Sequence, residues 1–235
     1  MAKSPVRYPS GVTTAISTNP LGMFGMPDPT KWHVYWNDFT TYAAGDWTIT
    51  KTEAGAGSAT HTLTDINGGA LLITCDAADN DNVFYQKVGE SFLLAANKQA
   101  FFKCRFKTSD ATQSDIVFGL QITDTTPLDV TDGVYFLKAD GAATADFICR
   151  KDASTGSTSD AVAITLADDT FVTLAWYYDG VSTIKYYKDD ALVGEVSASS
   201  SYLPDTELTI SFGIQNGEAV AKTMTVDYLF AALER

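Results

Sequence analysis

The chain has 235 residues, of which 45% are hydrophobic and 19% charged, and its formal net charge is −13. This acidity argues against nucleic-acid binding, because clustered lysine and arginine supply affinity for phosphate. No apolar stretch is long enough for a membrane-spanning helix, and the first residues lack the apolar region of a secretion signal. We therefore expect a soluble protein that is made in the cytoplasm and that binds neither nucleic acid nor membrane.

The first 31 residues differ in composition from the rest. They hold five of the seven prolines, and they carry three basic residues against one acidic residue, so residues 32–235 carry −15. Proline-constrained chain loses less entropy when it lies along a partner, which favours an extended arm over a disordered tail, the alternative. The expected partner-binding residues of this arm are Arg7, Tyr8, Pro9, Val12, Ile16, Leu21, Met23, Phe24 and Met26.

From residue 32 onward, apolar and polar residues alternate with a period of two, which is typical of strands that bury one face. Tight-turn signals such as Asn67-Gly68 and Asp179-Gly180 separate the strands. A helix of one or two turns is expected only at 90–97. The sequence predicts one all-β domain, 32–235, a two-sheet antiparallel β-sandwich of jelly-roll type. Its strands are expected at 33–40, 47–52, 58–64, 69–75, 82–88, 100–107, 116–122, 133–139, 145–151, 171–178, 183–188, 191–197, 208–215 and 224–230.

Several short motifs occur in an order that is found in a known family. They are Asn37-Asp38-Phe39, the segments 69–74, 101–106 and 118–120, the Trp176 to Gly180 segment with the hairpin after it, and Val226-Asp227-Tyr228. Over about residues 33–233 the chain resembles the concanavalin A-like lectin and glucanase sandwich. The resemblance implies the fold alone, because this fold serves lectins, hydrolases and structural modules.

Catalytic motifs are missing from the sequence. Glucanases of this fold carry Glu-x-Asp-x-x-Glu on one strand, whereas the six glutamates here are isolated from one another. Of the two histidines, His33 is expected at the junction between arm and sandwich, and His61 in a solvent-facing strand. These observations predict a protein that is not an enzyme.

The densest group of oxygen ligands is Asp76, Asp79 and Asp81, on a loop between two strands. It is a weak candidate for Ca²⁺, and a polar turn is the alternative. The acidic segment 124–132 is interpreted as a polar loop. Cys75, Cys104 and Cys149 are expected to be buried, reduced thiols. No other metal site and no cofactor is expected.

The arm adds a second resemblance. The segment Arg7 to Thr13, followed by Asp28 to His33, resembles the start of tailed-phage virion proteins that carry this sandwich. It implies a non-enzymatic capsid decoration or cement protein on the virion surface. The arm would bind the major capsid protein shell and neighbouring copies, and a homo-oligomer is expected, with a trimer favoured.

A lectin-like module that binds host glycans is the alternative function. Successive side chains of a strand point to opposite faces, so either Tyr186 or Tyr187 must point outward. Tyr187 is the candidate for stacking on a sugar. The same ring could instead contact a neighbouring subunit.

Overall fold

The computed structural model describes residues 29–153, 157–159 and 164–235. These residues form sixteen strands and two 3₁₀ helices, Ala44–Asp46 (η2) and Pro127–Asp129 (η3). Neither of these described helices has the length or the apolar character to span a membrane. All fourteen predicted strands are present within a few residues of their expected bounds, which confirms the predicted all-β fold.

One element was predicted wrongly. Residues 90–97 form no helix but contain the short strand β6 (Phe92–Leu93). Here the Ser91 N–H donates to Leu208 O, and β6 pairs with the start of β15 (Glu207–Asn216). Pairing with a distant strand therefore outweighs the local helical preference of this stretch.

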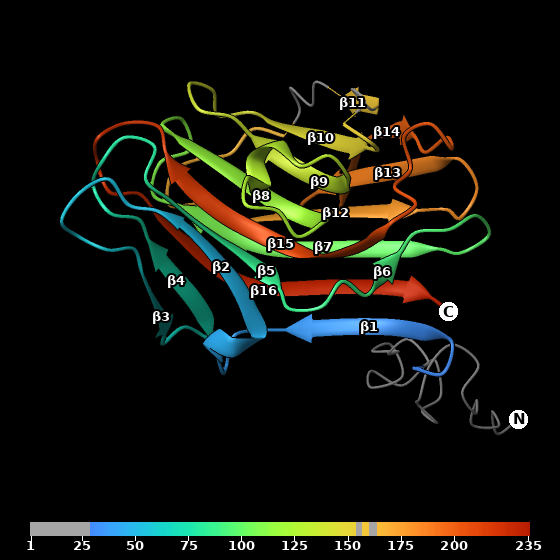
Figure 1. The fold of residues 1–235 in the computed structure, drawn as a ribbon, viewed down its shortest axis with the longest axis horizontal. Helices are drawn as coiled ribbons and strands as arrows, with labels where there is room; N and C mark the ends of the chain where they lie inside the picture. Colours follow the sequence, from blue (N-terminus) through green and yellow to red (C-terminus); the bar gives the residue numbers. More distant parts are fainter. Residues whose placement is uncertain (1–28, 154–156, 160–163) are drawn as a thin grey trace, which may run out of the picture.

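Sheet A contains both the first and the last described strands (Figure 1). All its pairings are antiparallel, and β4 and β1 pair with the first and the last part of β16 respectively. The order across the sheet is β14 (Ala191–Ser197), β13 (Thr183–Lys188), β12 (Val172–Tyr178), β7 (Ala100–Thr108), β16 (Thr223–Glu234), β4 (Ala70–Thr74) and β3 (Thr60–Thr64), with β1 (Trp32–Asn37) on β16.

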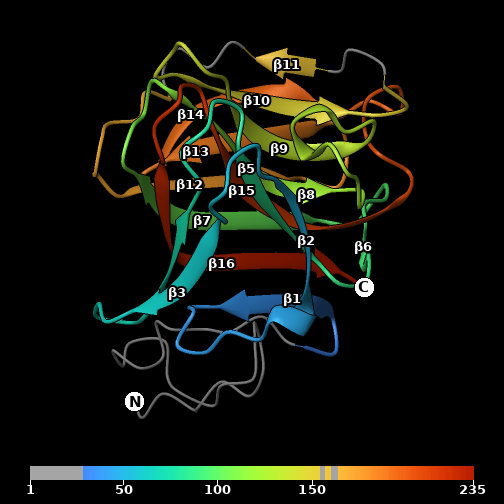
Figure 2. The same cartoon turned by 60° about the vertical axis from the view of Figure 1, so that its left-hand side comes forward.

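Sheet B packs against sheet A as the second layer of the sandwich (Figure 2). It is also antiparallel, and β6 pairs with its strand β15. The order is β11 (Ser157–Ser159), β10 (Ala145–Arg150), β9 (Gly133–Lys138), β8 (Ser114–Gln121), β15, β5 (Asn82–Lys87) and β2 (Trp47–Thr52).

The core lies between the sheets and is rich in stacked aromatic rings. The Phe106 ring of sheet A lies 4.2 Å from the Phe118 ring of sheet B, and Phe118, Phe212 and Tyr85 continue the stack at 5.9 and 5.0 Å. All four side chains are buried. The three cysteines are buried and free, as predicted. Burial raises the pKa of each thiol, which keeps the thiols protonated and unreactive.

Each sheet buries one face in this core. Its other face points outward and can contact a ligand. We call the outer surface of sheet A face A, and that of sheet B face B. Strand alternation decides which residues each face presents.

Candidate functional site

On face B, the segment 122–132 covers side chains of β5, β8 and β9. This segment packs on Phe84, Val117 and Tyr135, which point away from the main core and are nevertheless buried. Two buried amides hold it in place. Gln86 Nε2 donates to Ile122 O at 2.9 Å, and Gln121 Nε2 donates to Pro127 O at 2.9 Å. The segment that we interpreted as a polar loop is therefore the cover of a second, smaller apolar core.

The central strands of face B carry no close pair of acids. Asp115 is the one carboxylate that β8 and residues 209–215 of β15 direct outward, and both of its oxygens accept hydrogen bonds from neighbouring residues. Its Oδ2 accepts a hydrogen bond from Gln215 Nε2 at 3.1 Å, and its Oδ1 accepts one from the Asp140 N–H at 2.8 Å. Burial raises its pKa. The outward residues are Asp115, Val117, Gly119 and Gln121 on β8, and Thr209, Ser211, Gly213 and Gln215 on β15.

Face A carries a row of three cations. Lys103, Arg105 and Lys107 alternate with the buried residues of β7, so all three point outward. Each cation pairs with an aspartate from another element. Lys103 Nζ lies 2.5 Å from Asp190 Oδ1, Arg105 pairs with Asp227, and Lys107 Nζ lies 3.7 Å from Asp169 Oδ1.

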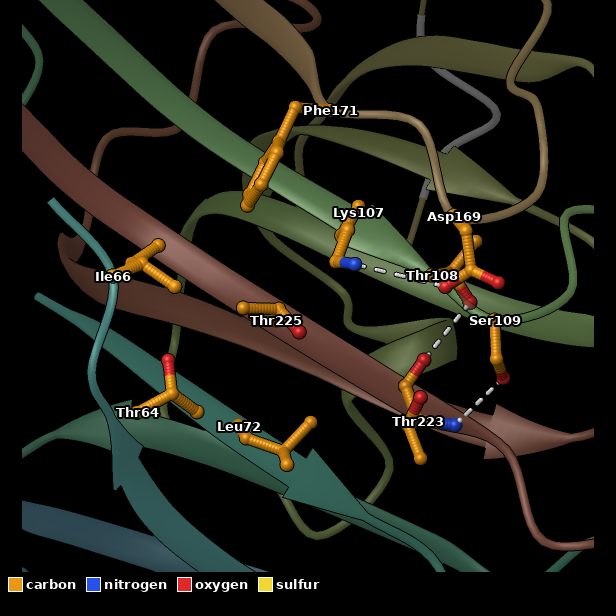
Figure 3. A pocket seen from close by; sticks show the side chains of 10 residues that line it. All are labelled: Thr64, Ile66, Leu72, Lys107, Thr108, Ser109, Asp169, Phe171, Thr223 and Thr225. Carbon is orange, nitrogen blue, oxygen red and sulfur yellow. Dashed lines mark hydrogen bonds and ion pairs between the residues drawn. The ribbon is translucent and has the colours of Figure 1, made fainter.

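A pocket of about 300 Å³ opens on face A at the Lys107 end of this row (Figure 3). Its walls come from β7, β16, the β3–β4 hairpin and the residues before β12. The Ser109 Oγ accepts a hydrogen bond from the Thr223 N–H at 2.9 Å, which closes one end of the pocket. The lining residues are Thr64, Ile66, Leu72, Lys107, Thr108, Ser109, Asp169, Phe171, Thr223 and Thr225.

Two side chains in this pocket are not explained by hydrogen bonding or core packing among the described residues. The Oγ1 of Thr64 is buried and has no hydrogen-bond partner within the described part of the chain. The Phe171 ring belongs to no core cluster of the described residues and instead lies beside cations. Its centre is 4.1 Å from the Arg105 guanidinium carbon and 5.6 Å from Lys107 Nζ. The pocket thus offers an aromatic ring, hydroxyl groups and a paired charge to a ligand.

Tyr187, the predicted stacking residue, also lies on face A. Its neighbour Tyr186 is buried and stacks on Phe147 at 5.0 Å, so Tyr187 takes the outward position. In the sheet, Tyr187 is paired with Ala175 of β12, and Ala175 is paired with Lys103 of β7. It is therefore two strands away from β7 and does not line the pocket around Phe171.

His33 lies in a different pocket, of about 510 Å³, beside Ser91, Glu90, Glu207 and Glu234. Its Nε2 is hydrogen-bonded to the Ser91 hydroxyl at 3.0 Å, and its ring packs on Phe92 at 4.7 Å. Burial, with a smaller effect of nearby Arg235, lowers the pKa of His33. Across the described residues, no carboxylate is hydrogen-bonded to this ring, so a catalytic triad is not formed.

The prediction for His61 was wrong. It was expected to face solvent, but its Nδ1 is hydrogen-bonded to the Tyr85 hydroxyl at 3.1 Å and its ring packs 4.6 Å from that of Tyr42. The register explains this, because His61 is paired with the buried Ile73. Burial, and to a lesser extent Lys51, lowers the pKa of His61.

The predicted calcium ligands do not form a cluster. Asp81 is buried, and its two carboxylate oxygens accept hydrogen bonds from the Ala54 and Ala78 N–H groups at 2.7 and 3.1 Å. No group of three acidic, histidine or cysteine side chains in the described ranges is arranged to hold a metal ion. Asp81 therefore ties the loop that contains Ala78 to the segment that contains Ala54.

The predicted arm residues, from Arg7 to Met26, lie outside the described residues. The capsid partner, the oligomeric state, the virion location and the boundary between residues 31 and 32 therefore stay predictions.

The sequence analysis missed the pocket on face A. The alternation of Lys103, Arg105 and Lys107 with buried residues was visible in the sequence and indicated that they share a face. Nothing local to Thr64 or Phe171 indicated that they would meet these cations, because the pocket joins segments that are distant in the chain.

No family model and no curated protein matches the chain. Solved structures do. An endo-1,3-β-glucanase from Streptomyces sioyaensis matches with a TM-score of 0.61 at 12% identity, over 89% of this chain and 99% of that one. An endo-β-1,4-glucuronan lyase from the fungus Trichoderma reesei matches with a TM-score of 0.53 at 10% identity, over 84% and 94%. Peanut lectin matches with a TM-score of 0.56 at 8% identity, over 86% and 97%.

These comparisons contradict the expectation that the chain is not an enzyme. Enzymes that cleave polysaccharides, both glucanases and a lyase, are among the similar structures, alongside lectins. The missing glucanase motif is therefore not sufficient to class the chain as a non-enzyme. Nothing in the comparisons indicates a role in a phage particle. At these identities the likeness shows the fold, and the chain has the jelly-roll sandwich of the concanavalin A-like glucanases and lectins.

Proposed function

We propose that the protein binds a glycan on face A, with the pocket between Thr64 and Phe171 as its primary site. The observation that carries this proposal is the lining of the pocket, which gathers the Phe171 ring, hydroxyl side chains and the Lys107–Asp169 pair around one cavity. Sugars are ligands that are rich in hydroxyl groups, which bond to such polar side chains.

The other groups in the pocket suit a pyranose ring. One face of a sugar ring is made of C–H groups and packs on an aromatic ring, here Phe171, while its hydroxyl groups bond to polar side chains. Lys107 and Asp169 can donate to and accept from the same sugar at the pocket rim, because they lie 3.7 Å apart. The fold supports the proposal, since similar structures include a lectin and enzymes named for glycans.

The test is a glycan array with the full-length protein, followed by calorimetry with the glycans that bind. Asp169→Asn and Phe171→Ala should each weaken binding by about tenfold, since each removes one contact of about 1–2 kcal/mol. Val88→Ala is the matched control, because Val88 is 55% exposed and lies directly after β5 of sheet B. It should leave binding unchanged.

If no glycan on the array is bound, or if the Asp169 and Phe171 variants bind as tightly as the native protein, the proposal is wrong. Chromatography of the bound glycan after incubation adds a separate readout. Shortened products that disappear with Phe171→Ala would show that the site both binds and cleaves its glycan.

A further inference from the structure

An exposed tryptophan lies on face A beyond the pocket. Trp36, on β1, is 53% exposed, and no other aromatic side chain in the described ranges is as exposed. One side of its ring is supported by Tyr228, at 5.3 Å between ring centres and 28° between planes, and Phe230 lies 6.2 Å away. Phe101 packs on Phe230 at 5.6 Å. The Trp36 ring is thus held in place by other aromatics while much of it faces solvent.

The strand register connects this cluster to the pocket. Lys107 of β7 is opposite Thr225 in the pocket, and Lys103 is opposite Phe230, which is itself opposite Trp36 on β1. Lys107 and Lys103 are four residues apart, so the two ends are about 13 Å apart along the strands. Arg105, opposite Tyr228, fills the space between them. Pocket, cation row and aromatic cluster therefore form one continuous strip along β7 and β16.

The charges of this strip are balanced. Asp190, Asp227 and Asp169 each neutralise one of the three cations. The chain as a whole carries −13, which repels polyanions. A strip of aromatic rings and paired charges can form hydrogen bonds with the hydroxyl groups of a neutral ligand. It does not attract an anionic polymer, because each of its three cations is already paired with an aspartate.

We propose that face A binds a linear, neutral polysaccharide that runs along β7 and β16, with one sugar in the pocket and another, several rings along the chain, stacked on Trp36. This inference rests on the proposed function, and it specifies the length and the charge of the ligand. A monosaccharide or a short glycan end would reach the pocket but not Trp36.

The test is calorimetry of the full-length protein with neutral β-1,3-linked gluco-oligosaccharides, from the disaccharide to the hexasaccharide. Affinity should rise with length until both ends of the strip are filled. Trp36→Ala should weaken hexasaccharide binding by about tenfold and leave disaccharide binding unchanged, whereas Phe171→Ala should weaken both. Val181→Ala, at a residue that is 70% exposed in the turn between β12 and β13, is the matched control.

The outcomes separate the two proposals. If neither the disaccharide nor the hexasaccharide binds, the extended site for this neutral polymer is overturned, and the glycan array decides whether the pocket binds another glycan. If the disaccharide binds as tightly as the hexasaccharide, or if Trp36→Ala weakens both equally, the extended site is wrong and the pocket stands. Tighter binding of polyglucuronate that is lost as salt is added would overturn the assignment to a neutral polymer.

Discussion

The Arg105 guanidinium lies over the Phe171 ring, 4.1 Å from its centre, while it is also paired with Asp227. The ring and the carboxylate therefore fix the guanidinium from two sides. A double-mutant cycle with Arg105→Met and Phe171→Leu should give a coupling energy of about 0.5–1 kcal/mol, which is typical of an exposed cation–π pair. Urea unfolding of the four proteins measures it. Lys185→Met with Phe171→Leu serves as control, and a coupling of equal size there would contradict a specific contact.

Thr64→Val should stabilise the free protein. Valine has nearly the same shape, and it removes the buried hydroxyl that has no partner in the described structure. We expect the free energy of unfolding in urea to rise by up to about 1 kcal/mol. A loss of stability in this variant would indicate that the hydroxyl already has a partner in the free protein.

Asp110 should contribute stability that is lost in acid. Burial alone would raise its pKa, but hydrogen bonds from Lys222 and from the Gln113 and Thr112 N–H groups lower it to about 2. The folded state then holds the proton less tightly than the unfolded state. The contribution, about 1–2 kcal/mol, is complete above the ordinary aspartate range and disappears as the pH falls from about 4 to 2. Unfolding free energies of native protein and Asp110→Asn should converge over this range; parallel curves would contradict the prediction.

Lys138 is buried, and its ammonium group donates to Thr112 O at 2.8 Å and to Ser114 O. Burial lowers its pKa to about 8 although several nearby aspartates oppose the shift. Lys138→Met leaves both carbonyl oxygens without this donor and should cost about 2–4 kcal/mol at pH 7. Between pH 8 and 10.5 the unfolded state binds more protons at this group than the folded state. Native stability relative to Lys138→Met should therefore rise over that range, and a difference that is constant with pH would contradict it.

Gly213 on β15 has no room for a side chain. A Cβ there would lie 2.5 Å from Val83 O and would also meet the Phe84 ring. Gly213→Ala should lower the free energy of unfolding by about 1–3 kcal/mol, because strand and ring must move apart. Gly45→Ala is the matched control, since nothing lies within 4 Å of a Cβ at that position. Thermal unfolding of both variants distinguishes them, and equal melting temperatures would refute the account.

Much of the fold could be predicted from the sequence, because each strand buries one face and alternation therefore survives in the residue order. The bounds of the strands that contain Thr183–Lys188 and Ala191–Ser197 were predicted exactly. Two short features were not predictable in this way. The strand Phe92–Leu93 depends on pairing with Leu208, and the inward position of His61 depends on its register with Ile73. Both are decided by residues that are far away in the chain.

The candidate site was harder to predict for the same reason. The sequence alone does not distinguish Trp36 from the aromatic residues that fill the core, because large rings dominate the interior of a two-sheet sandwich. Its exposure results from the pairing of β1 with β16, which places it opposite Phe230 on face A. For Tyr186 and Tyr187, local reasoning predicts that one ring points outward, because adjacent side chains of a strand point to opposite sides, but only the structure shows that this ring is Tyr187.

The position of β16 has a consequence for biosynthesis. This strand lies in the interior of sheet A, between β7 on one side and β4 and β1 on the other, yet it follows every other strand in the sequence. During translation, β1, β4 and β7 therefore lack their shared partner until residues 223–234 have been made. Sheet A can be completed only after the rest of both sheets has left the ribosome, so folding should be late and slow, as long-range strand pairing generally is.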